Sequence, residues 1–207
     1  MVEIKNKRII VFASGTGTNF INLYNNVING KIILLVSNNP NCAAVKFAIQ
    51  NKIDISIINT YRFPIEKNKN KQYEIVLNSY KPDLILLAGF MKKIPENIIA
   101  LYNNKIINIH PSLLPKFGGK GFYGIKVHEA VIKSGDSFTG VTIHFVNGKY
   151  DKGLVIMQEH VLVDKKDNAI TLSKKVLKKE YELYLKVVNL FCKEKIRIEN
   201  NLVIINE

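Results

Sequence analysis

The sequence predicts a single-domain α/β fold of the Rossmann-like kind, with a mostly parallel twisted sheet, helices on both faces and an antiparallel C-terminal part. In the first half of the chain, apolar runs rich in β-branched residues alternate with longer segments of helical spacing. These runs are unbroken, which is typical of parallel strands buried on both faces. After residue 110 the alternation stops. A length of 207 residues is enough for one domain with a full core.

The first half supplies most of the parallel sheet. Five apolar runs predict strands at Ile9–Ala13, Ile32–Val36, Ile55–Ile58, Leu84–Ala88 and Ile106–Ile109. The segments between them have apolar residues at helical spacing and predict helices at Asn19–Val27, Ala43–Asn51, Lys69–Tyr80 and Pro95–Tyr102.

The second half begins with a loop rich in glycine and proline, 111–124. The elements predicted after it are a helix at Lys126–Lys133, strands at Gly140–Val146 and Leu154–Val163, a long helix at Thr171–Lys193 and an edge strand or hairpin within Ile196–Ile205. The two strands are expected to pair antiparallel around the turn 147–153. We therefore expect one domain, 1–207, with halves 1–110 and 111–207.

Composition narrows the class of protein. The net charge of +13 permits nucleic-acid binding, but the lysines are scattered and no aromatic residues interleave with them. A compositional bias toward lysine, asparagine and isoleucine is the favoured interpretation of this charge, which would also help to attract small anionic substrates. The longest apolar run, Leu84–Met91, is too short to span a membrane, and the N-terminus lacks a signal-peptide core. Cys42 and Cys192 have no metal-binding spacing and are expected to be reduced packing residues of a cytoplasmic protein.

A glycine-rich loop, Ser14–Asn19, follows the first predicted strand. Glycines bring backbone amides close to an anion, and the N-terminus of the next helix adds partial positive charge. Thr18 or Asn19 is expected to cap that helix or to donate to the anion. The third glycine and the later acidic residue of a dinucleotide fingerprint are missing, so a monophosphate is the better candidate ligand. A purely structural turn fits this pattern equally well.

Asn108 and His110 form the candidate chemical centre. They stand two residues apart at the end of a predicted strand, so their side chains face the same side. The C-terminal ends of parallel strands are where α/β proteins place their ligands. An amide can stabilise a developing oxyanion, and an imidazole can move a proton near neutral pH. This pair indicates acyl-type transfer.

Asp151 is the predicted third member of this centre. A carboxylate beside His110 would orient the ring and raise its pKa. A turn aspartate or a hydrogen-bonded core histidine is the alternative interpretation for either residue. Three more histidines, His128, His144 and His160, are weaker candidates, and none has the spacing of a metal site.

Several motifs together resemble the folate-dependent formyltransferase family, and within it the GAR transformylases, which formylate glycinamide ribonucleotide (GAR). The segments that carry the resemblance, in chain order over nearly the whole sequence, are Ser14–Asn19, Leu87–Met91, Asn108–Pro115, Gly140–Val146 and Asp151–Gly153. The resemblance implies transfer of a formyl group from 10-formyltetrahydrofolate to the GAR amine in purine biosynthesis, with no metal. It also implies a monomer or homodimer that binds neither nucleic acid nor membrane.

The resemblance also implies roles for individual residues. Asn108 would hold the oxyanion, while His110, supported by Asp151, would shuttle protons. The residues expected to bind GAR are Gly15, Gly17, Thr18, Asn19 and Glu180. The residues expected to bind folate are Met91, Lys92, Lys93, Ile94, Asn108, Asn147, Gly148, Lys149 and Tyr150.

Two details stay open at this point. A basic residue after the third strand usually helps to bind substrate in this family, and Lys69, Asn70 and Lys71 all compete for that place. The loop 117–124 is longer than in the shortest members, and its Lys120 and Tyr123 either gate the site or belong to an ordinary surface loop. The rival activities are methionyl-tRNA formylation, hydrolysis of formyltetrahydrofolate and nucleic-acid binding. The first two are disfavoured because the chain has no room for the additional domains that they need.

Overall fold

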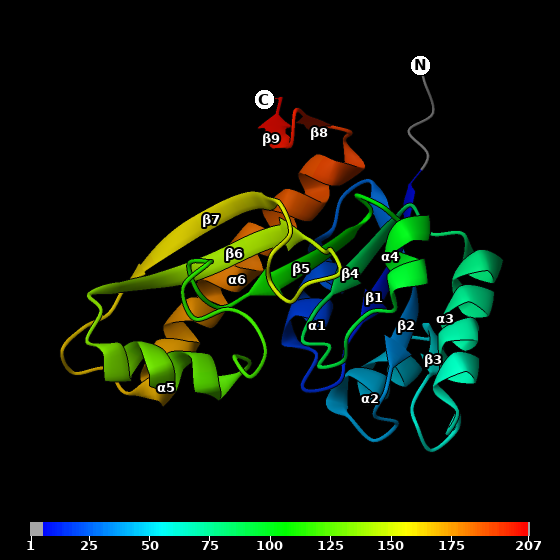
Figure 1. Ribbon diagram of the computed structural model, residues 1–207, viewed down its shortest axis with the longest axis horizontal. Helices are drawn as coiled ribbons and strands as arrows, with labels where there is room; N and C mark the ends of the chain where they lie inside the picture. The colour runs from blue at the N-terminus through cyan, green and yellow to red at the C-terminus, as the bar shows by residue number, and fades with distance from the viewer. Residues whose placement is uncertain (1–5, 207) are drawn as a thin grey trace. The chain divides into compact units, whose positions relative to one another are not determined.

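The computed structural model describes residues 6–206, and the chain divides into two compact units, 1–107 and 108–207. Figure 1 labels the helices and strands of each unit. The single domain 1–207 inferred from the sequence stays a prediction. Part of the N-terminal segment on which the signal-peptide argument rests, 1–5, lies outside the described residues.

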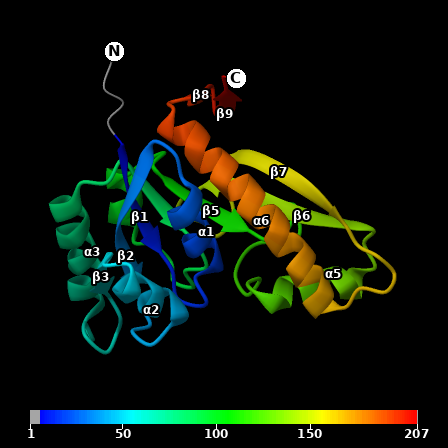
Figure 2. The ribbon, with the colours of Figure 1, turned by 180° about the vertical axis from the view of Figure 1, so that it is seen from behind.

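The first unit is a parallel α/β sheet. Its strands are β1 (Lys7–Phe12), β2 (Gly30–Ser37), β3 (Asp54–Ile57) and β4 (Leu84–Leu87), in the spatial order β3-β2-β1-β4. Its helices are α1 (Thr18–Asn26), α2 (Ala43–Gln50), α3 (Glu66–Tyr80) and α4 (Glu96–Leu101). Figures 1 and 2 show α1 and α2 on one face of this sheet, and α3 and α4 on the other.

The central strands of this unit are apolar on both faces because helices cover both. Every residue from Ile9 to Ala13 is fully buried, and Leu84–Leu86 are almost as inaccessible. Parallel strands with unbroken apolar sequence pack in this way. The α/β class and the parallel sheet predicted from these runs are confirmed.

The second unit contains the antiparallel part. β5 (Ile106–His110) runs from the end of the first unit into the second, and is followed by α5 (Ile125–Ser134), β6 (Phe138–Phe145) and β7 (Val155–Leu162). β6 and β7 pair antiparallel. The long helix α6 (Ala169–Cys192) packs against β6, β7 and α5, as Figure 2 shows, and β8 (Ile196–Glu199) with β9 (Leu202–Ile205) forms a separate hairpin.

Two helices, α3 and α6, begin more than one residue earlier than their apolar pattern predicts. α6 begins at Ala169 rather than Thr171, because Asn168 accepts hydrogen bonds from two backbone amides and forms a capping box with Thr171. α3 begins at Glu66, and the charged residues of its first turn conceal it from an apolar pattern. Helix ends depend on capping as much as on apolar spacing.

The two cysteines are buried and free, Cys42 at the N-cap of α2 and Cys192 at the last residue of α6. Among residues 6–206, no helix combines the length and the apolar character needed to cross a membrane.

Candidate functional site

The end of β5 carries the two residues on which the predicted chemistry depends. Asn108 is half-buried and His110 is 4% exposed. The Asn108 Nδ2 lies 3.1 Å from the His144 Nε2, and the His110 Nδ1 lies 3.6 Å from the Asp151 Oδ2. Both side chains therefore approach one group of polar residues within the second unit.

Asp151 lies in the turn between β6 and β7, where its positive φ of 51° marks a tight bend. One carboxylate oxygen, Oδ2, accepts a hydrogen bond of 2.8 Å from the Gly119 amide. The other, Oδ1, lies 3.6 Å from the His144 Nε2. The structure thus brings together the three residues that the sequence proposed for catalysis, Asn108, His110 and Asp151.

His144 is the residue of this cluster that the sequence analysis did not favour. It lies on β6, is 2% exposed, and sits where the register between β6 and β7 shifts at Ile143/His144. A bulge of this kind redirects a side chain. Polar and apolar residues alternate around His144, which is typical of a half-buried strand, but β6 is buried from Thr139 to Phe145. No signal in a single sequence distinguishes this histidine from an ordinary core residue.

The loop after β5 is held by a buried threonine. Thr142 on β6 donates to the Ser112 carbonyl oxygen over 2.6 Å and accepts from the Leu114 amide over 3.0 Å. Gln158 on β7 donates to the same threonine hydroxyl and to the Leu114 carbonyl oxygen. These bonds fix the backbone that leaves His110, so they limit how the ring can move.

The longer loop 117–124 closes over the imidazole. The His110 Nε2 donates to the Phe117 carbonyl oxygen over 2.8 Å. Lys120 and Tyr123 are both exposed, and the Tyr123 ring lies under the Lys126 ammonium at 5.0 Å. In this conformation the backbone of the loop, rather than either of these side chains, contacts the cluster.

The pKa of His110 lies below its ordinary value. Burial lowers its pKa, and this effect exceeds the opposite effects of the Asp151 carboxylate and the Phe117 carbonyl. The Asp151 carboxylate has the predicted direction of effect, but the net pKa is lowered, because the sequence reveals the carboxylate and not how fully the ring is buried. Burial alone would raise the pKa of Asp151, but the two histidine rings and the Gly119 amide lower it below its usual value.

The Asp151→Asn variant separates these effects. The carboxylate favours the imidazolium, so its removal is expected to lower the pKa of His110 further. The titration of histidine ring signals by NMR measures this shift, and the signal of the exposed His160 in the same spectra is the internal control. A His110 titration that is the same in both proteins would contradict direct coupling.

His128 on α5 gives the fold a dependence on pH. Burial, with a smaller effect of His110, lowers the pKa of His128 from 6.5 to about 4. Its Nδ1 has no hydrogen-bond partner within the described part of the chain. The unfolded chain takes up this proton more readily than the folded one, so the stability is fully present above pH 6.5 and is lost as the pH falls toward 4.

We therefore expect His128→Phe to reduce this loss. Between pH 7 and pH 4, the free energy of unfolding of the wild type should fall by up to roughly 3 kcal/mol more than that of the variant. Chemical denaturation at the two pH values measures the difference. Equal losses in both proteins would show that other groups cause the acid sensitivity.

The glycine-rich loop lies in the first unit. Gly17 is the N-cap of α1 with a φ of 72°, and a Cβ at this position would lie 2.8 Å from the Ala44 Cβ. Glycine is therefore required by backbone conformation and by packing. Thr18 and Asn19 lie inside the helix, so the prediction that one of them caps it is wrong. Their amides belong to the first turn, where N–H groups lack helical acceptors and favour an anion.

A cleft of about 730 Å³ opens in the first unit. Three of the four residues predicted to bind folate in this unit, Lys92, Lys93 and Ile94, line it, and Met91 is half exposed. Lys93 is also paired with Glu96, at 3.1 Å between Nζ and Oε1. Of the alternatives left open beyond the third strand, Lys69 and Asn70 line this cleft, and the choice among Lys69, Asn70 and Lys71 stays open.

The remaining predicted residues lie in the second unit. The segment Asn147–Tyr150 is exposed, and the Asn147 side chain shapes it by accepting from the Lys149 amide and donating to the Lys152 carbonyl oxygen, each over 2.9 Å. Glu180 is half-buried on α6. Within residues 6–206, no group of three or more His, Cys, Asp or Glu side chains could hold a metal ion.

Comparisons with known proteins point to one family. The formyl transferase domain family matches residues 7–188. The chain is 40% identical over 200 residues to a phosphoribosylglycinamide formyltransferase, named chloroplastic, from Arabidopsis thaliana, covering 94% of this chain and 68% of that protein. It is 30% identical over 200 residues to the Haemophilus influenzae phosphoribosylglycinamide formyltransferase, covering 95% and 92% of the two chains.

A crystal structure supports the same grouping. The phosphoribosylglycinamide formyltransferase from Anaplasma phagocytophilum superimposes with a TM-score of 0.87 at 32% identity, covering 98% of this chain and 95% of that one. The chain spans about two thirds of the length of the curated plant relatives.

Proposed function

Because the chain belongs to the formyl transferase family, we propose that it transfers a formyl group from 10-formyltetrahydrofolate to the amine of glycinamide ribonucleotide, a step of de novo purine biosynthesis. The products are formyl-GAR and tetrahydrofolate. The observation that carries the proposal is the meeting of an amide, two imidazoles and a carboxylate, Asn108, His110, His144 and Asp151, in the second unit.

Asn108 provides the hydrogen bond for the developing oxyanion. When the GAR amine attacks the formyl carbon, a C–N bond forms and the carbonyl oxygen takes up negative charge. An amide N–H directed at that oxygen stabilises the charge more in the transition state than in the ground state. Of the residues in the cluster, Asn108 is the one that presents a neutral donor regardless of pH.

His110 moves the proton. The attacking amine must lose a proton and the departing folate nitrogen must gain one before the second C–N bond breaks. The lowered pKa of His110 leaves its ring neutral at pH 7, and a neutral ring can accept the proton from the amine. Substrate replaces the Phe117 carbonyl as the partner of the His110 Nε2, which requires the loop 117–124 to move. The ring hydrogen then lies on the Nδ1, which faces Asp151, and the Nε2 is free to accept the proton from the amine and to pass it to the folate nitrogen. Asp151 then stabilises the imidazolium that forms.

The binding groups are assigned by the resemblance and supported by the local structure. The amides at the start of α1, in Gly17, Thr18 and Asn19, suit the nucleotide phosphate, and Gly15 offers open space beside them. The folate is assigned to the segments 91–94 and 147–150, and the GAR amine or ribose to Glu180.

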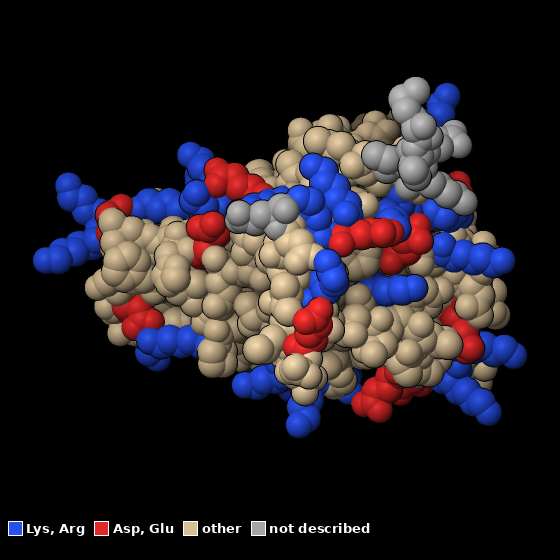
Figure 3. Space-filling model, turned by 90° about the horizontal axis from the view of Figure 1, so that it is seen from above, with Lys and Arg blue, Asp and Glu red and all other residues tan. Residues whose placement is uncertain are grey.

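Nucleic-acid binding is the rival from another class. On the face shown in Figure 3, Lys and Arg side chains are dispersed among Asp and Glu and do not form a continuous stripe. A dispersed charge of this kind favours attraction of small anions rather than binding of a nucleic acid along a continuous basic surface. The monomeric or homodimeric state and the cytoplasmic location stay predictions, and the plant relatives are named chloroplastic.

A spectrophotometric assay of folate deformylation tests the proposal. We expect rapid formation of tetrahydrofolate when GAR is present and almost none with water alone. Deformylation that is independent of GAR would identify a hydrolase. Absence of turnover, together with oligonucleotide affinity that falls steeply with salt, would favour the nucleic-acid alternative.

A further inference from the structure

His144 on β6 is buried, and its ring lies between two polar groups, a backbone carbonyl oxygen and the side-chain amide of Asn108. Its Nδ1 lies 2.8 Å from the Phe145 carbonyl oxygen, and its Nε2 lies 3.1 Å from the Asn108 Nδ2. The ring is 2% exposed, so bulk water does not compete for these partners. Each of the two ring nitrogens thus has one partner within hydrogen-bond distance.

These neighbours determine where the proton of the ring lies. A carbonyl oxygen can only accept, so the Nδ1 of His144 must carry a hydrogen and donate it to Phe145. In a neutral ring the Nε2 is then an acceptor, and the Asn108 amide nitrogen is a donor of matching character. The Asp151 Oδ1 lies 3.6 Å from the same Nε2, which is beyond hydrogen-bond distance.

The hydrogen bond between the Asn108 Nδ2 and the His144 Nε2 determines the orientation of the Asn108 carboxamide. The two ends of this group have similar shape and opposite hydrogen-bonding character, so shape alone does not orient it. If the carboxamide were turned over, its oxygen would face the lone pair of the Nε2, and two acceptors would be in contact in a buried place. An acceptor at the Nε2 therefore selects the orientation in which the amide nitrogen points to His144.

We propose that His144 is a positioning residue: its Nε2 accepts one N–H of Asn108 and so leaves the other N–H of the same amide for the oxyanion. The inference rests on the proposed function, because only formyl transfer creates that oxyanion. His144 itself touches no substrate. Its effect on the rate passes through Asn108, and that property distinguishes it from a residue that only fills the core.

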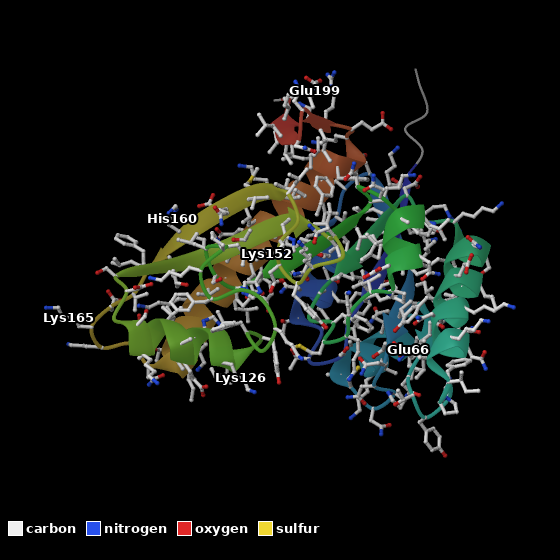
Figure 4. The ribbon with its side chains drawn as sticks, in the orientation of Figure 1. Glu66, Lys126, Lys152, His160, Lys165 and Glu199 are labelled. Atoms are coloured by element: carbon white, nitrogen blue, oxygen red, sulfur yellow. The ribbon has the colours of Figure 1, made fainter. Side chains whose placement is uncertain are left out.

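A double-mutant cycle tests this property. His144→Phe is expected to lower kcat by about 10-fold, because the Asn108 amide loses its orientation, while KM for both substrates changes by less than about twofold. In the Asn108→Ala background, the same substitution should change kcat by less than about twofold. His144→Gln, which carries an acceptor oxygen at a similar position, should recover most of the activity. His160→Phe, on the outward part of β7 that Figure 4 labels, is the matched control and should leave kcat unchanged.

Equal costs of His144→Phe in both backgrounds would overturn the inference, since they would show a structural role that is independent of Asn108. A second measurement does not need activity or a folded variant. In the wild-type protein labelled with ¹⁵N in histidine, NMR should show His144 protonated at Nδ1 and an acceptor at Nε2, and a proton at Nε2 with none at Nδ1 would overturn the inference. Absent turnover in the wild type would instead refute the proposed function.

Discussion

Asn108→Ala is expected to lower kcat by about 10²–10³, because it removes from the developing oxyanion an amide N–H that is a donor at any pH. Asn108→Asp, which keeps the shape and replaces the donor by an acceptor, should be at least as slow. KM for both substrates should change little, since the donor acts mainly in the transition state. Steady-state kinetics measure both constants.

The control for the two variants at Asn108 is Asn25→Ala, on the exposed side of α1. It is expected to leave kcat unchanged. Thermal unfolding of Asn108→Ala should stay close to the wild type, because the side chain is only half-buried. A variant at Asn108 that keeps most of its turnover would remove this amide from the mechanism.

Gly153→Ala is expected to reduce the free energy of unfolding by at least about 3 kcal/mol. A Cβ at Gly153 would lie 1.7 Å from the Phe145 carbonyl oxygen and 2.7 Å from its carbon, so the backbone must move. The same carbonyl accepts from the His144 Nδ1, and Asp151 lies two residues before the glycine. Any Gly153→Ala protein that still folds should therefore also lose kcat.

Denaturant unfolding measures this loss of stability. Gly15→Ala is the control for stability alone, because its Cβ would meet nothing within 4 Å and its backbone conformation suits other residues. If Gly153→Ala unfolded at the same denaturant concentration as the wild type, the close contact between Gly153 and the Phe145 carbonyl group would be contradicted.

Local sequence pattern was sufficient to predict most of the fold. The unbroken runs Ile9–Ala13 and Leu84–Ala88 and the helical spacing between strands predicted a parallel sheet, and the turn 147–153 predicted the antiparallel pair. The first turns of α3 and α6 were missed because capping and charged residues, rather than apolar spacing, determine where those helices begin.

The residues of the candidate site also divide into those that local sequence pattern predicts and those that it does not. Asn108 and His110 could be predicted because period-two spacing at a strand end is a local property, and the motif around Asp151 supplied the carboxylate. His144 could not be predicted, because its contact with Asn108 joins residues 36 positions apart and depends on a bulge in β6. The net pKa of His110 could not be predicted for a related reason, since burial, which outweighs the predicted effect of Asp151, arises only when the chain has folded.

The central claim is that the cluster around Asn108 directs a formyl group to an amine. Its most direct test is a single-turnover experiment with 10-formyltetrahydrofolate labelled with ¹³C in the formyl group, with saturating GAR and product analysis by mass spectrometry. We expect the label to appear in formyl-GAR, about 10²–10³-fold more slowly in Asn108→Ala than in the wild type. Label recovered as free formate, or formyl-GAR formed at the same rate by both proteins, would contradict it.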